Sequence, residues 1–263
     1  MTGNDLQRIV VQERDLLLLR ELAKHRIVDR EQAKCIAGFR STTRANARLL
    51  ALHRAGLLRR YFIGTEGGGV KALYALSEKG ARLAGVPYRG LRRRQNEMLV
   101  ADFSVVHQLS INSVYCAWKC SGSSIQTLAP SRWSTFQESI TKHAELIPDA
   151  YAEFDLPSGK LTTFLEVDLG HEALAKLKEK AKRYLQVALS GEYERSFHEK
   201  RFRVLVLAHS EQRARSIRKV VSEITPKIFW FGSLANATQD GLTSPVWLRP
   251  EGNEPEPFLR LTP

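Results

Sequence analysis

The sequence predicts a mixed α/β protein, α+β overall, that is built from two different domains. Residues 1–94 hold 20 lysines and arginines against 8 acidic residues, whereas residues 95–263 hold equal numbers of each, so the whole net charge of +12 lies in the first part. Helical patterns followed by a glycine-rich hairpin fill the first part, and strands that alternate with helices fill the second. A chain of 263 residues is long enough to bury a core in each part.

Three helices are expected first, because apolar residues recur at helical spacing between good capping residues. The first covers residues 13–25, and the second begins after Asp29 and ends before Gly38. The third begins after Ser41 and runs to about Ala55. Its first turns carry a row of polar side chains: Ser41, Thr42, Thr43, Arg44, Asn46 and Arg48. Arginine and asparagine match the edges of guanine and adenine in the major groove of DNA.

A β-hairpin is expected next, from strands at residues 57–63 and 70–76 joined by the turn TEGGG. Arg59, Arg60 and Lys71 flank this turn and suit contact with a phosphate backbone. Ser77 then begins a short helix, so the order is three helices, a hairpin and a helix. This order resembles the winged helix-turn-helix family, which implies double-stranded DNA as the partner and no cofactor for binding. A protein-binding or dimerisation module of the same shape is the alternative.

The boundaries that follow are a DNA-binding domain at residues 1–86 and a basic linker at residues 87–95. A second domain covers residues 96–240 and begins with a helix that runs to about Lys119. The proline-rich residues 241–263 are expected to form an irregular tail or a strap along the surface.

Three carboxylates gather in the second domain. Residues 147–170 form two strand-like runs around the turn Pro157-Ser158-Gly159-Lys160. One register of this hairpin pairs Asp149 with Asp168, and the other pairs Asp149 with Glu166. Both place Asp149, Glu166 and Asp168 on one face of the sheet, because residues two apart on a strand share a face. Such a cluster suits Mg²⁺ or Mn²⁺, and an acidic surface facing solvent is the alternative.

Pro148-Asp149 followed by Glu166-Val167-Asp168 resembles the PD-(D/E)XK nuclease-like superfamily. The downstream order fits it, with a helix at residues 171–190, a strand at 202–208, a helix at 211–224 and a strand at 228–234. Together with the first domain, the segments FLEVDLG and KLKEKAKRYL resemble the replication-relaxation family of plasmids and other mobile elements, over most of residues 10–235.

One departure from the nuclease pattern bears on activity. Active members place a lysine two residues after the acid, where this chain has Asp168. Lys178 or Lys180 of the next helix are the candidates to replace it. Two functions therefore stay open. One is a non-enzymatic DNA-binding protein, acting in transcriptional regulation or in replication or mobilisation, whose second domain serves dimerisation or partner contact. The other is a Mg²⁺- or Mn²⁺-dependent endonuclease that uses Asp149, Glu166, Asp168 and a helix lysine.

The remaining expectations concern the setting of the protein. No apolar run approaches the length of about 18 residues that a membrane span needs, and the N-terminus lacks a secretory pattern. We therefore expect a cytoplasmic protein without a membrane partner. A homodimer is expected because two-fold symmetry is common among winged-helix regulators.

Overall fold

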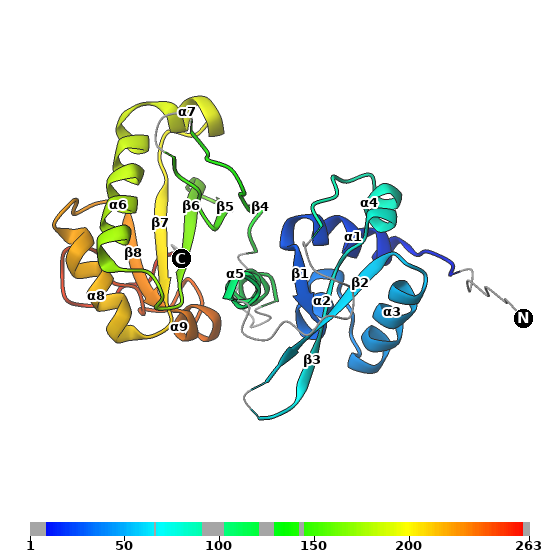
Figure 1. Ribbon diagram of the computed structural model, residues 1–263. Coiled ribbons are helices and arrows are strands. Elements are labelled where there is room, and N and C mark those ends of the chain that lie inside the picture. Colours follow the sequence, from blue (N-terminus) through cyan, green and yellow to red (C-terminus); the bar gives the residue numbers. More distant parts are fainter. Residues whose placement is uncertain (1–8, 66, 91–102, 121–128, 142–144, 260–263) are drawn as a thin grey trace, which may run out of the picture. The chain divides into compact units, whose positions relative to one another are not determined.

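The computed structural model describes residues 9–65, 67–90, 103–120, 129–141 and 145–259 (Figure 1). The chain forms two compact units, Met1–Cys116 and Ala117–Pro263. Helices and two separate sheets make it a mixed α/β protein, as the sequence predicts.

The helices of the first unit begin and end where their capping residues stand. They are α1 (Glu13–His25), α2 (Arg30–Ala37), α3 (Thr42–Arg54) and α4 (Glu78–Ala84). The Asp29 side chain accepts a hydrogen bond from the Gln32 backbone N–H at 2.8 Å and so caps α2. Gly38 ends that helix with a φ of 67°, a left-handed conformation that glycine adopts without strain. Ser41 and Ser77 cap α3 and α4, so the helix predictions are confirmed.

A three-stranded antiparallel sheet completes the first unit. Its strands are β1 (Ile27–Asp29), β2 (Leu58–Gly64) and β3 (Val70–Leu76), in the order β1-β3-β2. The β2–β3 hairpin is the predicted one, whereas β1 was not expected. Three residues are too few to show a strand pattern, and β1 exists because its backbone pairs with β3.

The helix α5 (Phe103–Cys120) shows why the first unit extends beyond the expected boundary at residue 86. Asn112 is fully buried, and its side-chain amide donates to the backbone oxygen of Ile27 at 2.7 Å. The Gln32 side chain likewise donates to the backbone oxygen of Leu109 at 2.8 Å. These bonds hold the first turns of α5 within the first unit. The expected linker lies outside the described residues from 91 onward, as does the expected helix before Phe103.

The second unit is built on a five-stranded sheet in the order β4-β5-β6-β7-β8. The strands are β4 (Arg132–Ser134), β5 (Ala150–Leu156), β6 (Gly159–Asp168), β7 (Arg203–Ala208) and β8 (Phe229–Ser233). β4, β5 and β6 are antiparallel neighbours, whereas β6, β7 and β8 run parallel. The helices are α6 (Leu174–Leu189), α7 (Glu192–Phe197), α8 (Glu211–Ser222) and α9 (Leu234–Gln239). The predicted alternation of strands and helices is confirmed; β4, α7 and α9 were not expected.

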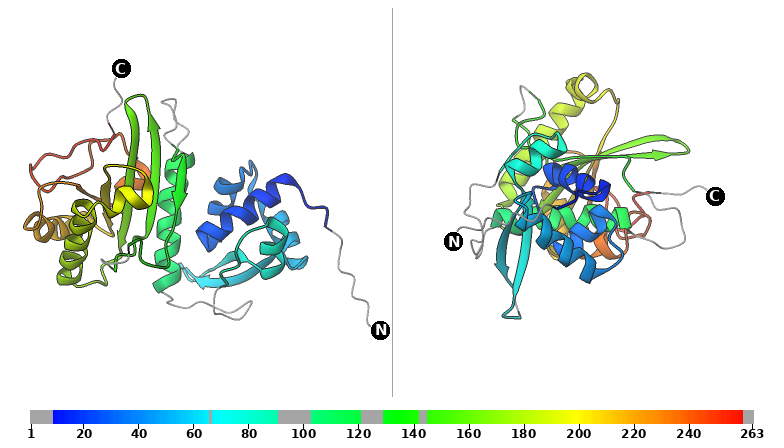
Figure 2. Two further views of the ribbon diagram at one scale, coloured as in Figure 1. Left: turned by 90° about the horizontal axis from the view of Figure 1, so that it is seen from above. Right: turned by 90° about the vertical axis from the view of Figure 1, so that its right-hand side faces the viewer.

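Helices α6 and α8 lie side by side on one face of this sheet (Figure 2). Their apolar residues form one buried cluster with Phe164 of β6 and Val206 of β7. On β5, Phe154 packs against the ring of Trp118 at a centroid distance of 5.8 Å. The sheet is therefore packed by apolar side chains, which fixes the direction in which each β6 side chain points.

The last described segment, residues 241–259, differs from the expected surface strap. Leu248 pairs with Phe231 of β8, and Trp247 pairs with Glu256. The Trp247 side chain is fully buried, and Phe258 and Leu259 are buried as well. Large apolar side chains among the prolines therefore make this segment part of the core. No described helix is long and apolar enough to cross a membrane.

Candidate functional site

The first turns of α3 present polar side chains to solvent. Ala45, Leu49 and Leu52 are fully buried and form the inner side of the helix. Thr43, Arg44 and Asn46 lie on the outer side and are exposed. We call these three residues the α3 surface.

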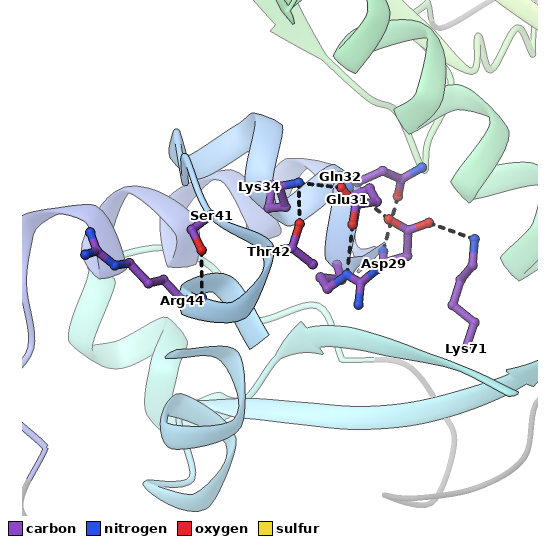
Figure 3. A network of polar contacts seen from close by, with 9 residues as sticks. Asp29, Glu31, Gln32, Lys34, Ser41, Thr42, Arg44 and Lys71 are labelled. Carbon is purple, nitrogen blue, oxygen red and sulfur yellow. Dashed lines mark hydrogen bonds and ion pairs between the residues drawn. The ribbon is translucent and has the colours of Figure 1, made fainter. Parts of the chain in front are cut away.

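Arg44 extends from the α3 surface away from the polar network around it (Figure 3). Its backbone N–H donates to the Ser41 hydroxyl at 3.4 Å, so the cap holds the residue in the first turn. Among the described residues, the Arg44 guanidinium has no hydrogen bond and no ion pair. Its full charge and all its donors are therefore available to an anionic ligand.

Arg48, one turn further along α3, has a different role from the one predicted. Its guanidinium donates to both carboxylate oxygens of Asp15 in α1, with Nε at 2.8 Å from Oδ1, and to the backbone oxygen of Val10 at 2.6 Å. Asp15 is only 1% exposed. The hydrogen bonds that Arg48 donates to Asp15 raise the pKa of Arg48. Arg48 thus joins α1 to α3, and contact with DNA would require breaking a buried ion pair.

Ser41 and Thr42 are also engaged within the fold. Ser41 is half-buried and caps the helix. The Thr42 hydroxyl accepts a hydrogen bond from Lys34 at 2.8 Å, and Lys34 pairs with Glu31 at 2.8 Å (Figure 3). These contacts connect α2 to α3 and set the start of α3.

The hairpin cations lie beside aromatic rings or an acid. The Arg59 guanidinium lies 5.4 Å from the ring centroid of Tyr61, and that of Arg60 lies 5.0 Å from the ring of Phe62. Lys71 is half-exposed and forms an ion pair of 3.0 Å with Asp29, the cap of α2 (Figure 3). Lys71 lies near the turn, whereas Arg59 and Arg60 lie at the other end of the hairpin strands, opposite Ala75 and Tyr74, and are half-buried.

The hairpin of the second unit adopts one of the two expected registers. Leu156 pairs with Gly159 and Ala150 with Leu165, and the Asp149 N–H donates to the Leu165 oxygen at 3.2 Å. Asp149 therefore lies opposite Glu166. Glu166 and Asp168 both contact helices on the α6 and α8 side of the sheet, as alternation along β6 requires. We call Asp149, Glu166 and Asp168 the acidic face.

Glu166 is almost completely buried within the acidic face. The Tyr184 hydroxyl donates to Oε1, and the Lys180 ammonium donates to Oε2. Burial raises the pKa of Glu166 to about 7; the charge of Lys180 opposes that rise, and the charge of Asp149 adds to it. The two carboxylates are thus close enough to affect one another, with the lysine beside them.

The other two carboxylates are also satisfied by the fold. Asp168 accepts hydrogen bonds from Arg213 of α8, at 2.7 Å from Nε and at 3.4 Å from Nη2. Asp149 accepts from the Val167 backbone N–H at 2.7 Å. Within the described ranges, no three acidic, histidine or cysteine side chains are placed to hold a metal ion. The carboxylates are thus engaged by protein groups, and the binding of Mg²⁺ or Mn²⁺ at Asp149, Glu166 and Asp168 stays a prediction.

Of the two candidate lysines, the structure brings Lys180 to the acidic face and places Lys178 elsewhere. Lys178 forms an ion pair with Glu223, at 2.6 Å on the surface.

Tyr184 and Arg213 belong to the site but were not among the residues predicted from the sequence. Tyr184 follows Lys180 by one helical turn and could have been found from that spacing. Arg213 could not, because its approach to Asp168 depends on how β6 and β7 align.

Comparison with known proteins gives one match. A family model described as replication-relaxation matches residues 19–199, a range that includes the α3 surface and the acidic face with Lys180 and Tyr184. Arg213 lies beyond the matched range. No curated protein and no solved structure matches the chain.

Proposed function

The chain belongs to the replication-relaxation family, and on that basis we propose that it is a DNA-binding protein of a plasmid or other mobile element. It binds double-stranded DNA through its first unit and acts in replication, mobilisation or transcriptional control. The second unit is nuclease-like but non-catalytic, and serves dimerisation or contact with a partner.

The observation that carries this proposal is the guanidinium of Arg44, which has no partner among the described residues, in a segment with a net charge of +12. A helix whose first turn carries exposed threonine, arginine and asparagine fits the major groove, where these side chains bond to base edges. Lysines and arginines nearby bind phosphates without regard to sequence. The α3 surface therefore reads the bases, and the cations of the β2–β3 hairpin hold the backbone.

The acidic face supports a non-catalytic second unit. A nuclease needs carboxylate oxygens that are free to hold a metal or to activate water. Here Glu166 and Asp168 accept hydrogen bonds from side chains on both of their oxygens, and Asp149 accepts one from the backbone. These contacts stabilise the fold and leave the acids occupied.

The DNA-binding proposal is tested with the Arg44→Ala variant of the full chain and a labelled duplex. We expect affinity to fall by about 1–3 kcal/mol, which corresponds to roughly 5- to 150-fold, if Arg44 contacts a base. The matched control is Arg215→Ala, which removes an exposed arginine of α8 in the second unit and should leave affinity unchanged. Equal affinity for wild type and Arg44→Ala would reject α3 as the reading helix.

The proposed homodimer has its own test. Light scattering of the full chain at micromolar concentration, with and without duplex DNA, should give the mass of two chains. A single-chain mass under both conditions would contradict dimerisation.

DNA cleavage is a second candidate function, and the position of Lys180 favours it. An acid–acid–lysine group, formed by Asp149, Glu166 and Lys180, resembles the nuclease arrangement with the lysine supplied by a helix. Plasmid DNA incubated with Mg²⁺ or Mn²⁺ and either wild type or Asp149→Ala decides between the two functions. Cleavage by wild type alone would establish the enzyme, and equal results would reject it.

A further inference from the structure

A second place for an anionic ligand lies in the second unit, away from the acidic face. A cavity of about 420 Å³ opens where β7 and β8 begin, at Arg203 and Phe229. The acidic face lies toward the other end of the same parallel strands, since Asp168 pairs with Ala208 at the end of β7. The two sites are therefore separate.

Positive charge dominates the wall of this cavity. It is lined by five cations, namely Lys200, Arg201, Arg203, Lys227 and Arg249, and none of its described lining residues is acidic. The nearby Glu199 is engaged with Lys160, at 3.5 Å. Burial and the charges of Arg249 and Arg201 lower the pKa of the half-buried Arg203. Like charges gathered without a counter-charge repel one another, and a bound anion relieves that repulsion.

An aromatic surface adjoins these cations. Trp230 is half-buried in the wall, and the Arg249 guanidinium lies 5.6 Å from its ring centroid. Phe258 meets the same ring edge-on at 5.3 Å and fixes its orientation. Planar bases stack on aromatic rings and on arginine guanidinium planes, whereas a phosphate needs the charge alone.

The backbone beside the cavity is held in an uncommon conformation. Ile228, a lining residue, has a φ of 62°, which is a rare value for a β-branched side chain. Its backbone oxygen accepts a hydrogen bond from the Val204 N–H at 2.7 Å, so β7 keeps it in place. Backbone strain of this kind clusters at active sites and ligand-binding sites.

We propose that this cavity binds one nucleotide unit, with its phosphate between Arg203 and Arg249 and its base against Trp230. The cavity volume lies within the range of small-ligand sites, about 300–1,000 Å³, and exceeds what a single phosphate requires. The unit is either a free nucleotide or one residue of single-stranded DNA. This inference does not depend on duplex binding by the α3 surface.

The test is calorimetric titration of the full chain with ATP, with a short thymidine oligonucleotide and with inorganic phosphate. We expect ATP, the oligonucleotide or both to bind more tightly than phosphate, and which of them binds identifies the source of the nucleotide. Arg249→Gln, at an exposed position, should weaken binding about tenfold through loss of a charge-assisted contact.

Two controls make the result decisive. Arg215→Gln removes an equal charge from exposed α8 and should bind as wild type does. Trp230→Phe should keep affinity for phosphate and lose part of the preference for the nucleotide. Absence of binding by every probe, equal affinity of wild type and Arg249→Gln, or phosphate binding as tight as that of ATP and the oligonucleotide would overturn the proposal. Duplex binding by the first unit would stand in each case.

Discussion

The two units differ in whether their charged side chains have partners within the fold. The α3 surface of the first unit carries an exposed arginine without a described partner. In the acidic face of the second unit, Glu166 and Asp168 are buried, Asp149 is half-buried, and each carboxylate accepts a hydrogen bond from the fold. A charge that is paired inside the protein has little left for a ligand, and removing its partner is costly. Two properties of a charged side chain therefore distinguish ligand binding from a structural role better than its residue type does. They are its exposure and whether it has a partner in the fold.

The same contrast occurs within a single helix. Arg44 and Arg48 lie one turn apart on α3, yet Arg44 points to solvent and Arg48 is bonded to the buried Asp15. Replacing Arg44 should therefore weaken DNA binding, whereas replacing Arg48 should lower the stability of the fold.

The largest expected effect is that of Arg48→Ala. It leaves the carboxylate of Asp15 buried without its cation, which costs about 3–5 kcal/mol in comparable buried pairs. Chemical denaturation of the full chain should show this loss in the unfolding transition that reports the first unit. Arg44→Ala, its matched control, should change stability by less than about 0.5 kcal/mol. An equal loss of stability in both variants would contradict the different roles assigned to Arg44 and Arg48.

Glu166 should make stability depend on pH. Its pKa in the folded protein is raised to about 7 from the ordinary 4.5, so the stability linked to its protonated form is fully present below pH 4.5 and is lost as pH rises through 7. Relative to Glu166→Gln, wild type should therefore lose about 3 kcal/mol between pH 4.5 and pH 8. Denaturant titrations of both proteins across this range measure the difference. A difference that does not change with pH would show that burial does not control this carboxyl.

Replacing Lys178 or Lys180 of α6 should have the smallest effect on stability, and the two variants should differ in how stability depends on pH. Lys178→Met removes an exposed ion pair with Glu223 and should alter stability by less than about 0.5 kcal/mol, with the pH profile unchanged. Lys180→Met removes the cation that opposes the raised pKa of Glu166. The pH-dependent loss of stability should therefore continue above pH 7. Identical pH profiles for the two variants would contradict the assignment of Lys180 to the acidic face.

Local features of the fold were predictable from the sequence, because caps and periodicity act over a few residues. The α2 and α3 boundaries follow from Asp29, Gly38 and Ser41. The shared face of Asp149, Glu166 and Asp168 follows from alternation along the strands, whichever register applies.

Features set by distant contacts were not predictable. The strand β1 depends on pairing with β3, and the burial of Trp247 depends on a segment that reads as a proline-rich tail. The partner of Arg48 lies in another helix, so the sequence shows only an arginine at a suitable spacing. Lys180 and Lys178 both lie near the apolar stripe of α6, and only packing against β6 selects between them.

The most direct test of the account is the salt dependence of duplex binding by the full chain. If cations of the first unit neutralise phosphates, the logarithm of affinity should fall linearly with the logarithm of salt concentration, by about 0.9 for each phosphate contacted. Lys71→Ala should make this slope shallower by about 1, and Arg215→Ala should not change it. A slope near zero for wild type, or no binding even at low salt, would contradict the claim that the basic first unit binds DNA.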